Sequence, residues 1–494
     1  MNPSLFRVAA TDSVATALDD LAAGTVASVG DGEVTLNEAV GRGHKVALRA
    51  IAPGEPVLKF GFPIGRATAP IAPGDRVHTH NVSTALEASA DYAWQPHQDD
   101  TQDSTPRAGF AGYRRADGRV GTRNEIWVIP TVGCVARTAQ KIAERANRKH
   151  EGRIDGVHAL THPFGCSQLG DDLDGTRSVL AALAAHPNAG GVLLLGLGCE
   201  SNQLDRLLAE IDPAVHGKIR TLAAQVAGDE VEEGLALVDA MVEEVALATR
   251  TEVPLSELVL GVKCGGSDGF SGLTANPLVG RMSDAVTGAG GTAILTEIPE
   301  IFGAEQLLMD RAADEQVFDG IGALVNDFKR YFTDHGEPVS ENPSPGNIAG
   351  GITTLEEKSL GAVQKAGHAI VTDVRRYGER VRRTGLTLLE APGNDAVSST
   401  ALAAAGATVI LFTTGRGTPL GFPVPTIKIA SNSPLAARKP GWIDFDAGRV
   451  LGEGMEPVAD ALLDTIRRIA SGEETAAERN GEREIAIWKR GVTL

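Results

Sequence analysis

The sequence predicts an α/β protein in which a small β-rich domain precedes a large region built on mostly parallel, doubly wound sheets. Short apolar runs separated by tight turns fill residues 1–94. Beyond residue 110, β-branched apolar runs alternate with helical patterns, which is typical of parallel strand–helix units. At 494 residues the chain is also too long for one simple core. We therefore expect a β-rich domain (1–94), a flexible linker (95–109) and two α/β subdomains (110–250 and 251–494).

Composition and net charge limit the partners and the cellular compartment that can be expected for this chain. The net charge is −18 and the pI is about 5.1, which argues against nucleic acid or an anionic membrane as the main partner. Four cysteines in this length cannot form a disulfide framework, so we expect a reducing cytoplasm. The N-terminus lacks the order of a signal peptide, and no apolar run approaches the ~20 residues that span a bilayer. Both a monomer and a homo-oligomer remain open.

The first domain ends with two histidines on a predicted strand. Its apolar runs are too closely spaced for crossover helices, so a compact barrel or clip of antiparallel strands is expected. His78 and His80 lie at positions i and i+2, which puts both imidazoles on one face of a strand. Such a pair can bind a divalent metal or supply a base beside one, or it can be a polar cross-strand pair.

Arginines mark the start of the first α/β subdomain. The segment after the acidic linker contains Arg114, Arg115, Arg119 and Arg123 before a strand. Arginine can donate two N–H groups to one carboxylate, so these residues are candidates for binding an acid substrate. At least two of them are expected in a solvated turn instead. A helical pattern over 136–149 completes the strand–helix unit.

All four cysteines follow apolar runs. Cys134, Cys166, Cys199 and Cys264 each stand just past a predicted strand, and three of them follow a glycine. Any one of them alone would be read as an ordinary buried thiol. Because ligands bind at the carboxyl ends of strands in open α/β sheets, the repeated position favours a metal or polar-site role for at least two.

Residues 258–280 contain the densest group of reactive side chains. The run LVLGV reads as a buried strand that ends at Lys263 and Cys264, followed by Asp268. Asn276 and Pro277 then offer an N-cap and a first-turn residue for a helix. A cation, a thiol and a carboxylate are therefore expected at one strand end.

Later strand ends add further polar groups. Glu297 and Glu300 follow the next strand and are candidates for metal ligation or general-base work, whereas Glu305 is expected in a first helical turn. Asn394 and Asp395 open a helix, and Arg416 lies in a Gly-rich loop after a strand. No glycine cluster matches a Walker A or dinucleotide fingerprint, which disfavours a nucleotide cofactor and a dehydrogenase.

Several long motifs occur in order along the chain and resemble one enzyme family. They are HTHN (78–81), GYRRADGRVGTRNEIWVIPTVGC (112–134), GCSQLGDD (165–172), GLGCE (196–200), CGGSDGFSGLTANP (264–277), ENPSPGNIAGGITTLEEKSLG (341–361), APGNDAVSSTALAAAGA (391–407) and FTTGRGTP (412–419). Together they resemble the altronate/galactarate dehydratase family, which joins an N-terminal SAF domain to a large dehydratase region. The HTHN form and the GVTL end are closest to its altronate branch. Ile348 stands where lysine is expected in this family.

The resemblance implies loss of water from a sugar acid. D-Altronate would give 2-dehydro-3-deoxy-D-gluconate, a step in hexuronate breakdown, with a divalent metal that is ferrous iron or, as an alternative, Mn²⁺. Removing the C2 proton creates negative charge on the carboxylate, so the reaction needs a Lewis acid or cations, a base, and an acid for the departing C3 hydroxyl.

Roles can be assigned to the candidates as hypotheses. His78 and His80 are assigned to metal binding or to the role of general base. The candidate soft ligands of the metal are the four cysteines, Cys134, Cys166, Cys199 and Cys264. Three of the cysteines would hold a ferrous ion or, as the less favoured option, an iron–sulfur cluster. Arg123 or Arg416 would hold the substrate carboxylate, with Asn276, Asn394 and Asp395 as further substrate contacts, and Lys263 or Glu300 would be the acid or base.

Two alternatives stay open. One is a lyase acting on galactarate or on another hydroxy acid, such as a sulfonated one, which a panel of aldonates and aldarates would reveal. The other is a sugar-acid binding protein without catalysis, which would bind ligand tightly but form no 2-keto acid.

Overall fold

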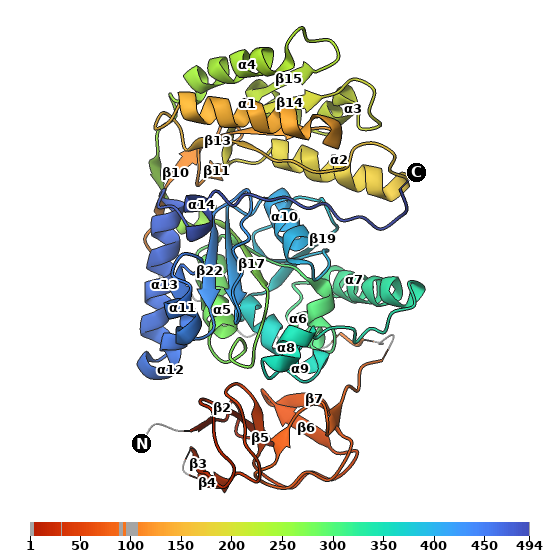
Figure 1. The fold of residues 1–494 in the computed structure, drawn as a ribbon, viewed down its shortest axis with the longest axis vertical. Helices are drawn as coiled ribbons and strands as arrows, with labels where there is room; N and C mark the ends of the chain where they lie inside the picture. The colour runs from red at the N-terminus through yellow and green to blue at the C-terminus, as the bar shows by residue number, and fades with distance from the viewer. Residues whose placement is uncertain (1–3, 31, 88–91, 95–106, 494) are drawn as a thin grey trace.

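The computed structural model describes residues 4–30, 32–87, 92–94 and 107–493. These residues form an N-terminal domain, a second domain and a C-terminal domain, stacked along the longest axis of the molecule (Figure 1). Most of the predicted linker over 95–109 lies outside the described residues. None of the helices in the described ranges is long and apolar enough to cross a membrane.

The N-terminal domain consists of short antiparallel strands. Its sheets have the orders β1-β2-β5-β8, β6-β7-β9 and β3-β4. The strands are β1 (Leu5–Phe6), β2 (Val14–Ala17), β3 (Val26–Val29), β4 (Gly32–Thr35), β5 (Lys45–Ala47), β6 (Pro56–Lys59), β7 (Phe62–Ala67), β8 (Arg76–Val77) and β9 (Val82–Ser83). Gly74, in the turn before β8, has φ of 90°, and a Cβ there would lie 2.0 Å from the Thr35 carbonyl oxygen. The predicted β-rich clip is confirmed.

The second domain contains a four-stranded parallel sheet of order β13-β12-β14-β15 and a small antiparallel sheet of order β11-β10-β16. Helices α1 and α4 pack on one face of the parallel sheet, and α2 and α3 pack on the other. The elements are β10 (Phe110–Arg114), β11 (Val120–Gly121), β12 (Glu125–Pro130), η1 (Gly133–Val135), α1 (Ala136–Lys149), β13 (Gly156–Ala159), α2 (Gly170–Ala184), β14 (Ala189–Gly196), α3 (Leu204–Ala209), η2 (Pro213–Lys218), β15 (Ile219–Ala223), α4 (Glu230–Val245) and β16 (Thr251–Val253).

The C-terminal domain is built on a seven-stranded parallel sheet of order β19-β20-β18-β17-β21-β22-β23. Its elements are η3 (Leu255–Glu257), β17 (Val259–Cys264), α5 (Ala275–Gly288), β18 (Thr292–Leu295), η4 (Ile298–Ile301), α6 (Gln306–Met309), α7 (Glu315–Asp334), α8 (Pro345–Ala349), α9 (Leu355–Ala362), η5 (Val363–Ala366), β19 (Val371–Arg375), β20 (Gly385–Leu389), α10 (Asp395–Ala405), β21 (Val409–Thr414), β22 (Thr426–Ala430), α11 (Ser433–Arg438), β23 (Phe445–Asp446), η6 (Ala447–Arg449), α12 (Val450–Glu453), α13 (Met455–Ala470) and α14 (Ala476–Arg479).

Both faces of this large sheet are covered. Successive residues of the central strands alternate between the faces, so Leu260 and Val262 join the core that includes α5 and α13. Ile294 and Ile410 join the core that includes α10 and, from the second domain, α2. Burial on both faces explains the continuous apolar runs in the sequence. The predicted parallel, doubly wound α/β region is confirmed.

A buried ion triad fixes the N-terminal domain to the C-terminal domain. Glu357 in α9 accepts from the Nζ of Lys45 and from the Nζ of Lys59, each at 2.8 Å. Burial alone would raise the pKa of Glu357, but the two lysines lower it to about 2. The carboxyl ends of the large sheet point toward this interface (Figure 1). The N-terminal domain therefore forms one wall beside the edge where ligands of parallel sheets bind.

Candidate active site

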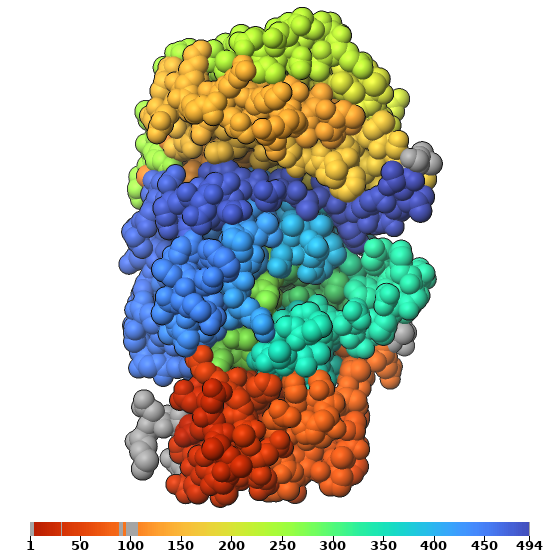
Figure 2. All heavy atoms as spheres, viewed as in Figure 1, coloured from red at the N-terminus to blue at the C-terminus, as the bar shows by residue number. Residues whose placement is uncertain are grey.

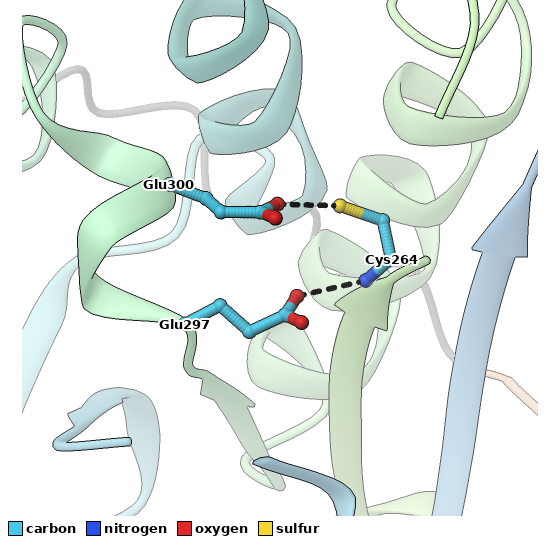
Figure 3. Close-up of side chains that lie close together, drawn as sticks. All are labelled: Cys264, Glu297 and Glu300. Atoms are coloured by element: carbon cyan, nitrogen blue, oxygen red, sulfur yellow. Dashed lines mark hydrogen bonds between the residues drawn. The ribbon is translucent and has the colours of Figure 1, made fainter. Parts of the chain in front are cut away.

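The carboxyl ends of β17 and β18 bring one thiol and two carboxylates together (Figure 3). Cys264 ends β17, and Glu297 and Glu300 lie in the turn after β18. The Sγ of Cys264 donates to Glu300 Oε2 at 3.0 Å, and the backbone N–H of Cys264 donates to Glu297 Oε2 at 3.0 Å. The three ligand atoms lie within 4.8 Å of one another, which among the described residues defines one group able to hold a metal ion.

Glu297 has an unusual backbone conformation. Its φ is 67°, in the left-handed region that residues other than glycine rarely adopt. Its carboxylate is fixed by the N–H of Cys264 and by an ion pair with Lys263 at 2.8 Å. Such conformations concentrate at functional sites, where the surrounding structure holds them in place.

Three buried lysines surround this group. Lys263 pairs with Glu297, Lys358 pairs with Glu300 at 2.7 Å, and the Nζ of Lys365 lies 2.8 Å from the Sγ of Cys264. Buried charges need partners, and here each acidic group has its own cation. The lysines also place positive charge at the strand ends, where the negative charge of an acid substrate would be stabilised.

The surroundings shift the acidities of the three groups in different directions. Burial, reinforced by the nearby Glu300, raises the pKa of the Cys264 thiol to about 12. Burial also raises the pKa of Glu297, although Lys263 opposes the shift. At Glu300 burial is outweighed by Lys358 and Lys365, which lower the pKa. A metal ion that binds this sulfur must therefore displace its proton.

Three groups lie at the outer rim of the same edge. Asp395 is 36% exposed at its side chain, and its Oδ1 accepts from Lys263 at 2.7 Å. Asn394 is exposed and caps α10 through its side-chain oxygen, as predicted. Arg416 is exposed and donates to the Gly346 carbonyl at 3.0 Å. Figure 2 shows a recess between the blue C-terminal segments and the teal segment of α8 and α9, with green residues at its floor.

Asn276 has a different local role from the predicted one. Helix α5 begins at Ala275 with Thr274 as its N-cap, so Asn276 lies within the first turn. Its Nδ2 donates to the Gly361 carbonyl at 3.0 Å, and its Oδ1 accepts from Thr413 Oγ1 at 2.7 Å. The predicted cap was wrong because the helix starts earlier, and the buried amide joins α5 to β21 and α9 instead.

Asp268 connects the loops that follow three neighbouring strands of the large sheet. Its Oδ1 accepts from Ser431 Oγ at 2.8 Å, and its Oδ2 accepts from Asn432 Nδ2 at 3.0 Å. A Cβ on Gly415 would lie 2.3 Å from the Asp268 carboxyl carbon, so that glycine is required by close approach. The loops after β17, β21 and β22 are thereby held together next to Arg416.

The two histidines do not join the Cys264 group. His78 is buried beside the start of α9, and its Nδ1 lies 3.2 Å from Thr353 Oγ1. Burial, together with Lys45 and His44, lowers the pKa of His78 to about 4, so the ring is neutral at pH 7. His80 is exposed on the N-terminal domain. His78 thus occupies the domain interface rather than a metal shell with the cysteines.

The guanidinium of Arg123 is occupied by other residues of the protein and is not open to a substrate. Its guanidinium is buried and donates to both carboxylate oxygens of Glu478, at 2.8 and 3.0 Å, and to three backbone carbonyls. These bonds connect the second domain to the segment after α13. A carboxylate substrate cannot reach a guanidinium occupied in this way, so Arg416 is the better placed of the two candidates.

The four cysteines do not meet at one centre. Cys264 is buried in the C-terminal domain, whereas Cys134, Cys166 and Cys199 are exposed on the second domain. Sequence order placed all four at strand ends correctly, but those strands belong to two separate sheets. The expected single cluster of thiols and imidazoles was therefore wrong.

Lys358 and Lys365 were not among the predicted site residues. They lie seven residues apart across α9 and η5, close to two helical turns, and so both reach the same strand ends. The available signal was the occurrence of two lysines at this spacing within a segment that is otherwise rich in small and apolar residues. Charged residues on a helix usually indicate a solvent-exposed face, so the pattern alone does not mark these two lysines as site residues.

Comparison with known proteins covers nearly the whole chain. Family models match as the altronate/galactarate dehydratase SAF domain (3–85), the D-galactarate dehydratase/altronate hydrolase second domain (112–246) and the D-galactarate/altronate dehydratase C-terminal domain (255–493). The altronate dehydratase of Escherichia coli strain K12 is 51% identical over 495 residues, with 99% of each chain covered.

Two further dehydratases are similar to this chain over nearly its full length. The altronate dehydratase of Bacillus subtilis strain 168 is 48% identical, with 99% of this chain and 100% of the relative covered. The galactarate dehydratase (L-threo-forming) of Escherichia coli strain K12 is 35% identical, with 95% and 93% covered. The chain therefore belongs to the D-galactarate/altronate dehydratase family.

Proposed function

We propose that this protein is a hydro-lyase that removes water from D-altronate to give 2-dehydro-3-deoxy-D-gluconate, in the breakdown of hexuronates. The observation that carries the proposal is the group of Cys264, Glu297 and Glu300 among three buried lysines, at the strand ends of a chain about half identical to two altronate dehydratases. The lower identity to the galactarate enzyme favours altronate over galactarate.

The donor set fits a divalent metal. One thiolate and two carboxylates combine a soft ligand with hard ones, which suits Fe²⁺ better than Mg²⁺ or Ca²⁺. Cys264, Glu297 and Glu300 would hold the ion, and Mn²⁺ is the alternative that the two carboxylates allow. When bound, the ion supplies Lewis-acid stabilisation of the charge that develops on the substrate carboxylate.

Substrate binding is assigned to the rim. Arg416 is exposed and can turn its guanidinium to the carboxylate of a sugar acid. Asn394 offers a neighbouring amide, and a Cβ on Gly393, just before it, would lie 3.7 Å from Glu300 Oε1. The rim and the buried group are thus close enough for one small substrate to touch both.

The base must reach the substrate, which favours Asp395. Its carboxylate is partly exposed, whereas Glu297 and Cys264 are fully enclosed. Lys263 holds Asp395 at 2.7 Å and orients it toward the rim. We therefore assign removal of the C2 proton to an Asp395 carboxylate oxygen and assign Lys263 to positioning, because its ammonium is shared between Glu297 and Asp395.

Lys358 is assigned as the acid. Its ammonium is held by Glu300 and by the side-chain oxygens of Asn342 at 2.8 Å and Asn347 at 3.3 Å. The negative charge of Glu300 raises the pKa of Lys358 although burial opposes the shift, so this group carries a proton at neutral pH. That proton is available to the C3 oxygen as it departs as water, and Lys365 adds positive charge beside the same region.

The test is anaerobic turnover of a panel of sugar acids with Fe²⁺ or Mn²⁺, read as 2-keto acid formation. We expect D-altronate to be dehydrated faster than galactarate and other aldarates. Preference for an aldarate would contradict the substrate assignment, and tight binding without keto-acid formation would contradict a catalytic function altogether.

A further inference from the structure

Three exposed cysteines lie at one edge of the second domain. Strands β13, β12 and β14 are direct neighbours in the parallel sheet, and their carboxyl ends lead to Cys166, Cys134 and Cys199, respectively. All three thiols are exposed. Free cysteine is among the most buried residue types, so three exposed thiols at a single sheet edge need an explanation.

The three cysteine-bearing loops are connected to one another by hydrogen bonds. The N–H of Gly133 donates to the Phe164 carbonyl at 2.8 Å, and the N–H of Asn202 donates to the Gly165 carbonyl at 2.9 Å. The Nδ2 of Asn202 also donates to the Thr131 carbonyl at 3.2 Å. Each bond joins positions within three residues of two different cysteines, so the thiols are held at fixed relative positions.

The glycine before each cysteine allows this close approach. A Cβ on Gly165 would lie 2.1 Å from the Thr131 carbonyl oxygen, and a Cβ on Gly133 would lie 2.9 Å from Pro163 Cα. Gly198 has φ of 129°, and Ser167, just after Cys166, has φ of 54°. A side chain at Gly133 or Gly165 would therefore clash with a neighbouring loop.

Two of the sulfurs already have donors directed at them. Ser201 Oγ donates to Cys166 Sγ at 3.9 Å, and Gln225 Nε2 donates to Cys199 Sγ at 3.5 Å. Donors of this kind favour thiolates, the form that ligates metals.

The three sulfurs are not arranged to bind a single ion. The three Sγ atoms do not all lie within 4.8 Å of one another. A single zinc or iron ion with sulfur at about 2.3 Å would draw tetrahedral ligands to roughly 4 Å apart. A cluster of several irons holds its cysteine sulfurs farther apart, because each sulfur binds a different iron.

We propose that Cys134, Cys166 and Cys199 hold a 4Fe–4S cluster on the second domain. The remaining cysteine of the sequence, Cys264, is buried in the C-terminal domain, so one iron of the cluster has no cysteine ligand. Because the thiols are exposed, that iron faces solvent and takes water or a small oxygen ligand. This site is separate from the Cys264 group and does not depend on the proposed dehydratase reaction.

The experiment uses the full chain purified and reconstituted anaerobically with ferrous ion and sulfide. Iron, acid-labile sulfide and the visible and electron paramagnetic resonance spectra are measured for the wild type and for Cys134→Ser, Cys166→Ser and Cys199→Ser. We expect about four labile sulfides and about five irons per chain in the wild type, four irons in the cluster and one at the Cys264 group. Each variant should lose the labile sulfide and the cluster spectrum. Cys264→Ser is the matched control and should keep the cluster.

Absence of labile sulfide after reconstitution would overturn the proposal. A cluster that survives in any of the three variants, or one that disappears in Cys264→Ser, would overturn it as well. Alkylation of the wild type, mapped by mass spectrometry, avoids reliance on variants that fold poorly. The three thiols should be protected after reconstitution and reactive before it, and equal labelling in both states would contradict the assignment.

Discussion

Replacing Glu357 by glutamine should weaken the junction between the N-terminal and C-terminal domains. The change preserves size but removes the charge that pairs with Lys45 and Lys59, both of which are buried. Removing one partner of a buried ion pair costs about 3–5 kcal/mol because the other charges stay buried. The shift in the pKa of Glu357 from 4.5 to about 2 gives a similar figure of about 3 kcal/mol.

The sign of the pH dependence follows from the direction of this shift. The folded pKa lies below the unfolded value, so the contribution of Glu357 is fully present above pH 4.5 and is lost as the pH falls toward 2. Urea unfolding at neutral pH, followed by circular dichroism, should show an earlier first transition for Glu357→Gln. The difference from the wild type should shrink as the pH is lowered through this range.

A compensated variant provides the control. Lys45→Met/Lys59→Met/Glu357→Leu replaces the whole triad with apolar groups and should recover most of the lost stability, because no charge then remains buried. If Glu357→Gln unfolds at the wild-type urea concentration, or if the compensated variant is no more stable than Glu357→Gln, the triad does not fasten the domains as described.

Three further predictions concern the proposed reaction. Asp395→Asn should lower turnover by roughly 10²-fold or more, and it should lower the exchange of the substrate C2 hydrogen with solvent deuterium to a similar degree. Lys358→Met should lower turnover but keep measurable exchange. Loss of exchange only in the lysine variant would reverse the two roles. Arg416→Gln should raise KM more than it lowers kcat, and an unchanged KM would remove Arg416 from substrate binding. Arg123→Gln should instead lower the unfolding midpoint and leave KM near the wild-type value, which steady-state kinetics and thermal unfolding check together.

The fold could be predicted from the sequence because its signals are local. The alternation of apolar runs with helical patterns is a property of short segments, and both sheets are parallel as expected. Likewise, Asn394 caps α10, and α1 spans Ala136–Lys149, as the cap and the helical pattern indicate. The start of α5 was misplaced because Thr274 and Asn276 are both plausible near a helix start, and only tertiary contacts decide between them.

The site could be predicted only in part. Strand ends correctly indicated Cys264, Glu297 and Glu300, because chemistry gathers at the carboxyl edge of a parallel sheet. Which strands share a sheet is not a local property, so the cysteines of two domains were grouped as one. Arg123 could not be distinguished from Arg416 for the same reason, since its partner Glu478 lies 355 residues farther along the chain.

The proposed metal site is tested most directly by metal-dependent dehydration of D-altronate, using a chain stripped with chelator and then supplied anaerobically with ferrous ion. We predict that keto-acid formation returns in the wild type and in Arg123→Lys, but not in Cys264→Ser or Glu297→Gln, which should also bind less added metal. Wild-type turnover and metal binding in the Cys264 and Glu297 variants would contradict a catalytic metal ion at this group.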